Sequence, residues 1–152
     1  MTVDLTLGSY TVEPGEEITF GTFSSLVTPE EHSGIWYNLE AYKYHEEDDF
    51  TDSVSLCVTL DYIMYEELDD LIAVNDGYNV TTNNCVDFAV RIWNQITDDT
   101  LSGKQTEDSL SLPANLRDEI EDRIGEVHDR PLPDWEEVGY TQGGVLVPVY
   151  SK

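Results

Sequence analysis

The sequence predicts an α+β fold, formed as one domain over residues 1–152. Three observations point to this class. Segments with alternating polarity and turn residues fill the N-terminal third, and helix-like periodicity follows in the middle of the chain. A short β-rich segment then closes the chain after a Gly-Gly pair. No internal repeat or linker is visible, and the length is sufficient for one hydrophobic core.

The N-terminal part is expected to form strands over residues 2–27, with a turn at "EPG" (13–15). "GIWYN" (34–38) continues the strand pattern. We expect the chain to turn at residues 38–41, so that "AYKYH" (41–45) returns as the second strand of a hairpin. The apolar run "VSLCVTL" (54–60) predicts a buried strand, with Cys57 in the core.

Helical patterns follow. Residues 61–75 place apolar side chains at helical spacing and stop at "NDG"; the expected buried positions are Ile63, Leu68, Leu71 and Ile72. Residues 112–127 predict a later helix that begins near Pro113, because proline suits the first helical position. In the closing strand, Pro148 indicates an edge position or a bulge, because proline has no N–H to donate.

The charge is extreme. Thirty-two Asp and Glu oppose seven Lys and Arg, which gives a formal net charge of -25, whereas a small domain typically carries a magnitude of ~2–8. Such self-repulsion becomes tolerable near molar salt, where the screening length falls to ~3 Å. The acids are scattered along the chain, so we expect a halophilic protein; a mesophilic protein that binds a basic partner or many cations would cluster them. Direct nucleic-acid binding is disfavoured, because no basic patch offsets the phosphates.

No segment of the sequence predicts a signal peptide or a membrane span of ~20 apolar residues. We therefore expect the protein in the cytoplasm of a high-salt cell or in a virus particle. Two cysteines cannot make a disulfide framework. No close ligand pair such as C-x-x-C is present, so no metal or other cofactor is predicted.

The segment around Cys85 predicts an amphipathic helix. Asn84 suits the N-cap position, and Asp87 can complete a capping box. One apolar face follows at helical spacing: Cys85, Phe88, Ala89, Ile92, Trp93 and Ile96. The helix N-terminus favours a thiolate at Cys85 and could hold an oxyanion, whereas the acidic background raises the thiol pKa. The competing interpretation is that Cys85 is a small buried apolar residue.

Two motifs together resemble those of the permuted papain-like cysteine hydrolases. These motifs are His32-Ser33-Gly34-Ile35-Trp36-Tyr37 and the segment from Tyr78 through Asn83-Asn84-Cys85-Val86-Asp87-Phe88-Ala89. The group includes lecithin:retinol acyltransferase-like enzymes, PPPDE peptidases and relatives of NlpC-type amidases. The resemblance covers residues 30–96. It implies an antiparallel sheet packed against the helix that starts at a nucleophilic Cys85, with His32 as the base and Asn84 and Tyr78 in support.

The third residue of such a site is open. If residues 38–41 turn the chain into a hairpin, His45 and His32 share one face, so His45 could orient His32. Glu40 and Asn38 compete with it, since a carboxylate or an amide orients an imidazole equally well. The plainer interpretation of His45 is a solvated surface histidine.

Two functions from different classes follow. The first is a thiol hydrolase or acyltransferase that cleaves an amide, isopeptide or ester bond in a peptide, isopeptide or lipid-linked substrate. The second is a structural or interaction subunit of an assembly, for example a halophilic virus particle or tail, that retains the hydrolase fold in active or degenerate form. Thiol reactivity discriminates between them.

Overall fold

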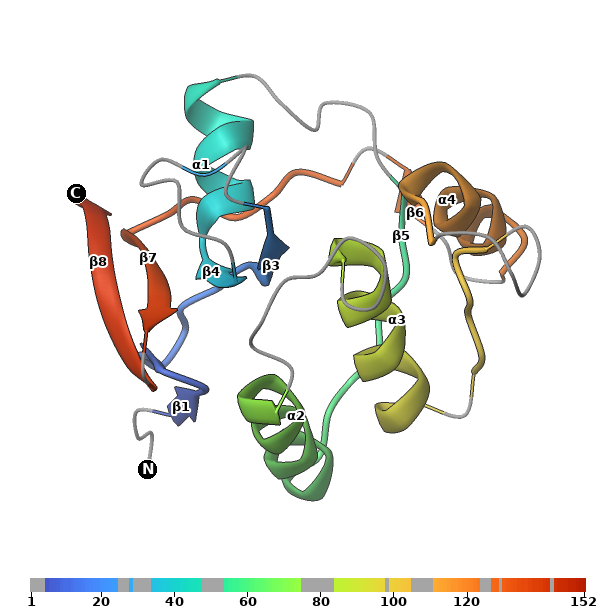
Figure 1. Cartoon of the computed structure of the whole chain (residues 1–152), viewed down its shortest axis with the longest axis horizontal. Helices are drawn as coiled ribbons and strands as arrows, with labels where there is room; N and C mark the ends of the chain where they lie inside the picture. The colour runs from blue at the N-terminus through green and yellow to red at the C-terminus, as the bar shows by residue number, and fades with distance from the viewer. Residues whose placement is uncertain are drawn as a thin grey trace.

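The computed structural model describes residues 5–24, 28, 34–47, 54–74, 84–97, 99–104, 111–123, 127–128, 130–142 and 144–152. Four strands precede the first helix, a short strand and three more helices follow, and three strands close the chain (Figure 1). In chain order they are β1 (Leu5–Leu7), β2 (Tyr10–Val12), β3 (Phe20–Phe23), β4 (Gly34–Tyr37), α1 (Leu39–Glu46), β5 (Val54–Ser55), α2 (Tyr62–Val74), α3 (Cys85–Ile96), α4 (Pro113–Glu121), β6 (Val127–His128), β7 (Glu137–Gln142) and β8 (Val145–Ser151).

The main sheet is four-stranded and antiparallel, in the order β3-β4-β7-β8. Two further antiparallel pairs, β1-β2 and β5-β6, accompany it. The expected α+β class is therefore confirmed. Strand β8 lies at the sheet edge, and its Pro148 pairs with Gly139 next to a register shift. Both positions expected for Pro148, an edge and a bulge, are found together, because neither requires an N–H donor there.

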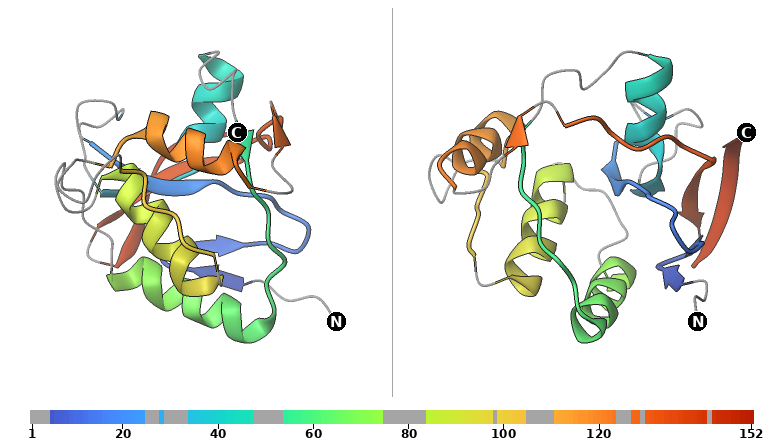
Figure 2. Two further views of the ribbon diagram at one scale, coloured as in Figure 1. Left: turned by 90° about the vertical axis from the view of Figure 1, so that its right-hand side faces the viewer. Right: turned by 180° about the vertical axis from the view of Figure 1, so that it is seen from behind.

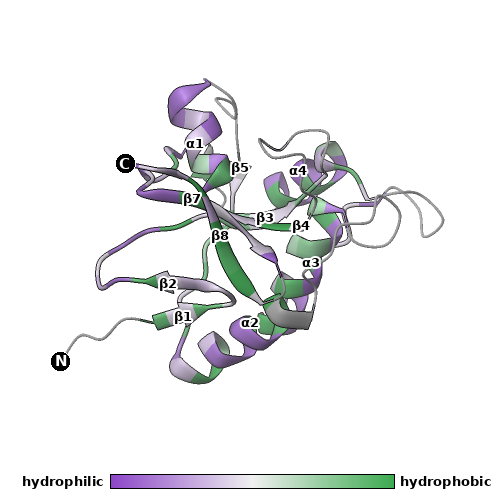
Figure 3. Ribbon diagram, turned by 60° about the vertical axis from the view of Figure 1, so that its left-hand side comes forward, coloured by the Kyte–Doolittle hydropathy of each residue, from purple (hydrophilic) through white to green (hydrophobic). Residues whose placement is uncertain are grey.

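Strand β4 carries the core on both of its faces. All four of its residues are buried, and successive side chains point to opposite sides of the sheet. Ile35 and Tyr37 pack in a cluster with Leu68 and Ile72 of α2 and Phe88 of α3. The intervening Trp36 packs with Leu39 and Ala41 of α1 and with Trp135 and Val138. Helices α2 and α3 lie together, apart from α1 (Figure 2), and both carry apolar and polar segments along their length (Figure 3).

Asn38 ends β4 and turns the chain directly into α1. Its backbone is left-handed, with a φ of 62°, which Asn tolerates better than most residues. The side-chain Oδ1 accepts from the Thr19 N–H, and Nδ2 donates to the Glu137 carbonyl and the Tyr10 hydroxyl. The expected hairpin over residues 38–45 is therefore wrong. A helix forms instead, because it buries Leu39 and Ala41 against the Trp36 face of the sheet.

Two further expectations are corrected. Of the apolar run at 54–60, only Val54–Ser55 form a strand, and Cys57 is exposed rather than in the core. The run does not join the main sheet; Leu60 packs instead against the cluster around Phe88. In α2, whose expected position is confirmed, Leu68 and Ile72 are buried but Ile63 is 75% exposed. Ile63 sits in the first turn, on the side of α2 that faces solvent.

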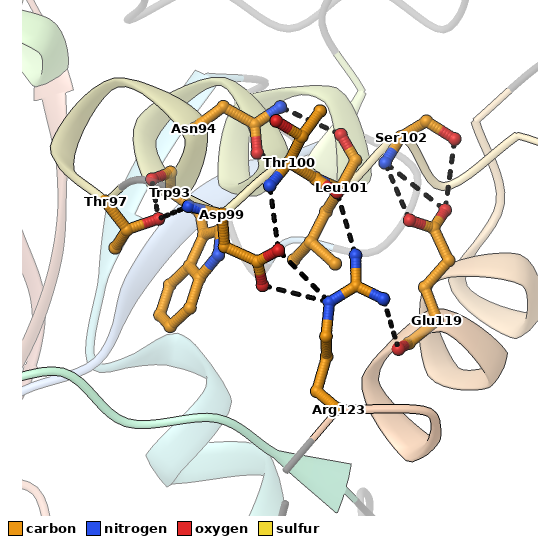
Figure 4. A network of polar contacts seen from close by, with 9 residues as sticks. All are labelled: Trp93, Asn94, Thr97, Asp99, Thr100, Leu101, Ser102, Glu119 and Arg123. Atoms are coloured by element: carbon orange, nitrogen blue, oxygen red, sulfur yellow. Dashed lines mark hydrogen bonds and ion pairs between the residues drawn. The ribbon is translucent and has the colours of Figure 1, made fainter. Parts of the chain in front are cut away.

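A polar network fixes the C-terminal end of α3 to α4 (Figure 4). The Asn94 side chain accepts from the N–H of Leu101 and donates to its carbonyl, both at 2.8 Å. Arg123 pairs with Asp99 at 3.0 Å, and Glu119 accepts from the N–H groups of Ser102 and Gly103. The helix that begins at Cys85 is therefore held at its far end by side chains rather than by apolar packing alone.

Within the described ranges, none of the helices combines the length and apolar character needed to cross a membrane.

Candidate functional site

Helix α3 begins with the expected capping box. Asn84 Oδ1 accepts from the Asp87 N–H at 2.9 Å, and Asp87 Oδ2 accepts from the Asn84 N–H at 3.1 Å. Asn84 Nδ2 also donates to the Ser111 carbonyl at 3.0 Å. The Asn84 amide is thus fully used in holding the helix start. The N–H groups of Cys85 and Val86 lie beside the thiol and favour its ionised form.

A cavity of about 310 Å³ lies beside Cys85. Its wall on α3 is the apolar face expected from the sequence: Cys85, Phe88, Ala89, Ile92, Trp93 and Ile96. Phe20 and Gly21 of β3, Glu40 of α1 and Leu60 complete much of the opposite wall. The Phe20 and Phe88 rings meet edge to face, 6.2 Å apart. The apolar face of α3 therefore serves two purposes, since it packs against β3 and leaves a space next to the thiol.

Glu40 is the one charged side chain among the described residues that line this cavity. It lies in the first turn of α1, with its Oε1 close to Gly21, where an added Cβ would approach it to 3.1 Å. Within the described part of the chain, the carboxyl makes neither a hydrogen bond nor an ion pair. Burial raises its pKa to about 7. Glu40 is therefore a carboxyl that changes charge near neutral pH inside a largely apolar space.

Cys85 is exposed and not in a disulfide. Its pKa is raised, first because protein atoms shield the thiol from water, and further because of the charges of Glu40 and Asp87. The N–H groups of Val86 and Cys85 lower the pKa but do not offset this rise. Of the two opposing influences expected from the sequence, the helix N-terminus lowers the pKa and the acidic charges raise it. Shielding from water, which the sequence did not predict, is the largest cause of the net rise. The resting thiol is neutral at physiological pH and needs a proton acceptor to react.

Among the described residues, the structure does not bring the remaining predicted site residues together beside Cys85. His32 and Tyr78 lie outside the described residues. His45 lies on α1 instead of a strand, and its Nε2 is 3.0 Å from the carbonyl oxygens of both Leu132 and Pro133. The expected strand face shared by His45 and His32 is therefore wrong, because residues 39–46 are helical. The Asn38 amide is committed to its three hydrogen bonds, so it holds the chain turn.

Cys57 also departs from expectation. It is exposed, and Arg130 Nη1 donates to its sulfur at 2.7 Å. It is therefore a second accessible thiol, which an experiment on Cys85 must remove. Over the ranges that the structure describes, no group of three His, Cys, Asp or Glu side chains is arranged to hold a metal ion.

The sequence did not reveal that Glu40 would line the cavity with Cys85. It suggested Glu40 only as one of the candidates to orient His32, and nothing in the sequence distinguishes this carboxyl from the chain's other acids. Its place depends on the left-handed turn at Asn38, which aims the first turn of α1 toward β3 and α3.

No model of a known protein family, no curated protein and no solved structure matches this chain. Its function is therefore inferred from the site itself.

Proposed function

We propose that the protein is a thiol hydrolase or acyltransferase that uses Cys85 to cleave an amide, isopeptide or ester bond. The observation that supports this most directly is the exposed thiol in the first turn of α3, at the wall of a 310 Å³ apolar cavity. Such a cavity can take the apolar part of a substrate while its carbonyl reaches the sulfur. The proposal includes a permuted papain-like fold. An antiparallel sheet with α3 against β3 is compatible with that fold.

The reaction would proceed in two balanced steps. Cys85 Sγ loses its proton to a base and attacks the substrate carbonyl carbon; the amine or alcohol then leaves with a proton, and a thioester remains. Water, or a second acceptor in an acyltransferase, attacks the thioester carbonyl, and the sulfur regains its proton. The N–H groups of Cys85 and Val86 are the donors available to the oxyanion, because Asn84 already accepts from the N–H groups of Asp87 and Phe88.

A base is essential to this scheme, because the pKa of Cys85 is raised and little thiolate exists near neutral pH. His32 is our proposed base, on the strength of the sequence motif alone. In this role His32 would take the thiol proton as the sulfur attacks and return it to the leaving group.

The test is acylation of Cys85 in a Cys57→Ser background, which removes the other exposed thiol. The protein is mixed with activated aryl esters and aryl amides of varied acyl length, and the intact mass and the released phenol or aniline are followed. We expect a mass increase of one acyl group, located on Cys85 by peptide mapping. Cys85→Ser should abolish it, and His32→Ala should slow it while the circular dichroism spectrum stays unchanged.

The alternative is a structural subunit that keeps the fold without the chemistry. The neutral resting thiol favours it, since the described surroundings raise the pKa of Cys85 despite the opposing effect of the Cys85 and Val86 N–H groups. This alternative predicts that Cys85 in the folded protein gains no acyl group from any ester and reacts with alkylating agents independently of His32.

A further inference from the structure

The Glu40 carboxyl presents an unusual electrostatic problem. It is partly buried, lines a space whose other walls are mostly apolar, and has no polar partner within the described residues. A buried charge without a partner is costly, so such a group gains most from a ligand that supplies the opposite charge or a hydrogen bond. The proposed chemistry at Cys85 does not use this carboxyl.

The charges in and around the cavity favour cationic ligands over anionic ones. None of the described lining residues is Lys, Arg or His, so an anionic head group would meet Glu40 with no counterion. The whole chain carries a formal charge of -25, which also repels anions and attracts cations. A cationic head group next to the carboxylate satisfies both conditions.

The volume limits the apolar part of the ligand. A dry apolar cavity of about 150 Å³ is enough to bind benzene. The 310 Å³ beside Cys85 would therefore hold about one aromatic ring with a short alkyl chain. Phe88, Ile92 and Trp93 supply the apolar wall along α3, and Glu40 supplies one polar contact from α1.

We propose that this cavity binds an apolar primary amine, whose protonated amino group donates hydrogen bonds to the Glu40 carboxylate while its hydrocarbon body lies along α3. The site requires neither a thiolate at Cys85 nor the bond cleavage proposed above. It would accept a small arylalkyl amine or the equivalent end of a larger molecule.

The test compares three probes that share one body: phenylbutylamine, phenylbutanol and phenylbutyrate. Binding is measured by isothermal titration calorimetry at about pH 8, where Glu40 is ionised and the amine, like a lysine, is protonated. In potassium chloride near 1 M the screening length is ~3 Å, so the acidic surface no longer attracts the amine over long distances. Only charges close to the bound probe then distinguish the three probes from one another. We expect the amine to bind roughly 10- to 100-fold more tightly than the alcohol, as for a hydrogen bond between charged groups.

Matched variants complete the experiment. Glu40→Gln keeps the shape of the side chain and should reduce the affinity for the amine to that for the alcohol. Glu67→Gln removes one charge from an exposed position of α2 and should change nothing. Amine binding is read by calorimetry and acylation by intact mass, so failed acylation and failed amine binding are separate results. Equal binding of the three probes, preference for phenylbutyrate, no binding, or an amine affinity indifferent to Glu40→Gln would each overturn the proposal.

Discussion

Glu40 and Cys85 belong to the first turns of two different helices, α1 and α3, yet both side chains line one cavity. The negative charge of Glu40 contributes to the raised pKa of the Cys85 thiol. Such coupling is mutual, so ionisation of either group disfavours ionisation of the other. Near neutral pH the pair therefore carries at most one negative charge, and it resides on the carboxyl.

Removal of the Glu40 charge should make Cys85 more reactive. In a Cys57→Ser background, we expect Glu40→Gln to increase the rate of alkylation of Cys85 by iodoacetamide severalfold at about pH 8. The reason is that the neutral amide no longer opposes the thiolate, so the pKa of Cys85 falls. The rate is followed by intact mass, with Glu67→Gln as the control for loss of an exposed charge. A slower reaction in Glu40→Gln would instead identify Glu40 as the group that accepts the thiol proton.

The same carboxyl should make stability depend on pH. The pKa of Glu40 is raised from an ordinary value of 4.5 to about 7 in the folded protein, so the unfolded chain releases this proton first. Its penalty is absent below about pH 4.5, develops as the pH rises toward 7, and stays constant above. Glu40→Gln should therefore match the parent at low pH and gain up to about 3 kcal/mol of unfolding free energy near pH 8.

Urea denaturation of both proteins at several pH values between 4 and 9 gives this difference directly. Glu67→Gln again serves as the comparison, because Glu67 is exposed. A difference between Glu40→Gln and the parent that stays constant with pH would show that the carboxyl titrates normally in the folded state.

Local signals in the sequence were sufficient for the starts of α3 and α4. The end of α4 was not predicted: the helix expected to reach residue 127 stops at Glu121, and Val127 lies in β6. The Asn84 and Asp87 pair placed the start of α3, and Pro113 placed the start of α4, because caps act within a single turn. Cys85 and the apolar face of α3 follow from the same periodicity. These features depend on neighbours in the chain, so the sequence alone determines them.

The errors arose where distant contacts decide the structure. Helix α1 depends on the left-handed turn at Asn38, which is held by Thr19, Tyr10 and Glu137 from three other segments. The exposed position of Cys57 depends on where the 56–60 segment runs relative to α3. The place of Glu40 beside Cys85 combines both effects, so no pattern within the chain could have indicated it.

The capping box at the start of α3 should contribute measurably to the free energy of unfolding. Asn84→Ala removes the acceptor for the Asp87 N–H and the donor to the Ser111 carbonyl. We expect a loss of about 1–2 kcal/mol in the free energy of unfolding, the usual cost of a lost N-cap. Asn84→Asp keeps the cap acceptor but not the donor and should recover part of the loss in urea denaturation. If Asn84→Ala and Asn84→Asp are equally destabilised, the cap itself contributes little.

The final prediction concerns the net charge of -25. The ion pairs found among the described residues lie at the surface and join Lys43 to Glu47, Arg117 to Glu121, Arg123 to Asp99 and Lys152 to Asp134. Exposed pairs contribute little, and seven cations cannot neutralise thirty-two acids. Screening by salt should therefore stabilise the fold. We expect the melting temperature to rise by roughly 5–10 °C between about 0.1 M and 2 M potassium chloride, equivalent to ~2 kcal/mol.

A charge-reduced variant separates screening from the general effect of salt on apolar surface. Glu67→Gln, Asp70→Asn and Asp118→Asn together remove three exposed charges from α2 and α4. Since repulsion is strongest in dilute buffer, this triple variant should melt higher than the parent at about 0.1 M salt and respond less to added salt. A parent melting temperature that is constant or falls with salt would contradict the halophilic interpretation. An equal response of parent and variant would assign the stabilisation to apolar surface instead, because charge repulsion differs between the two proteins and apolar burial does not.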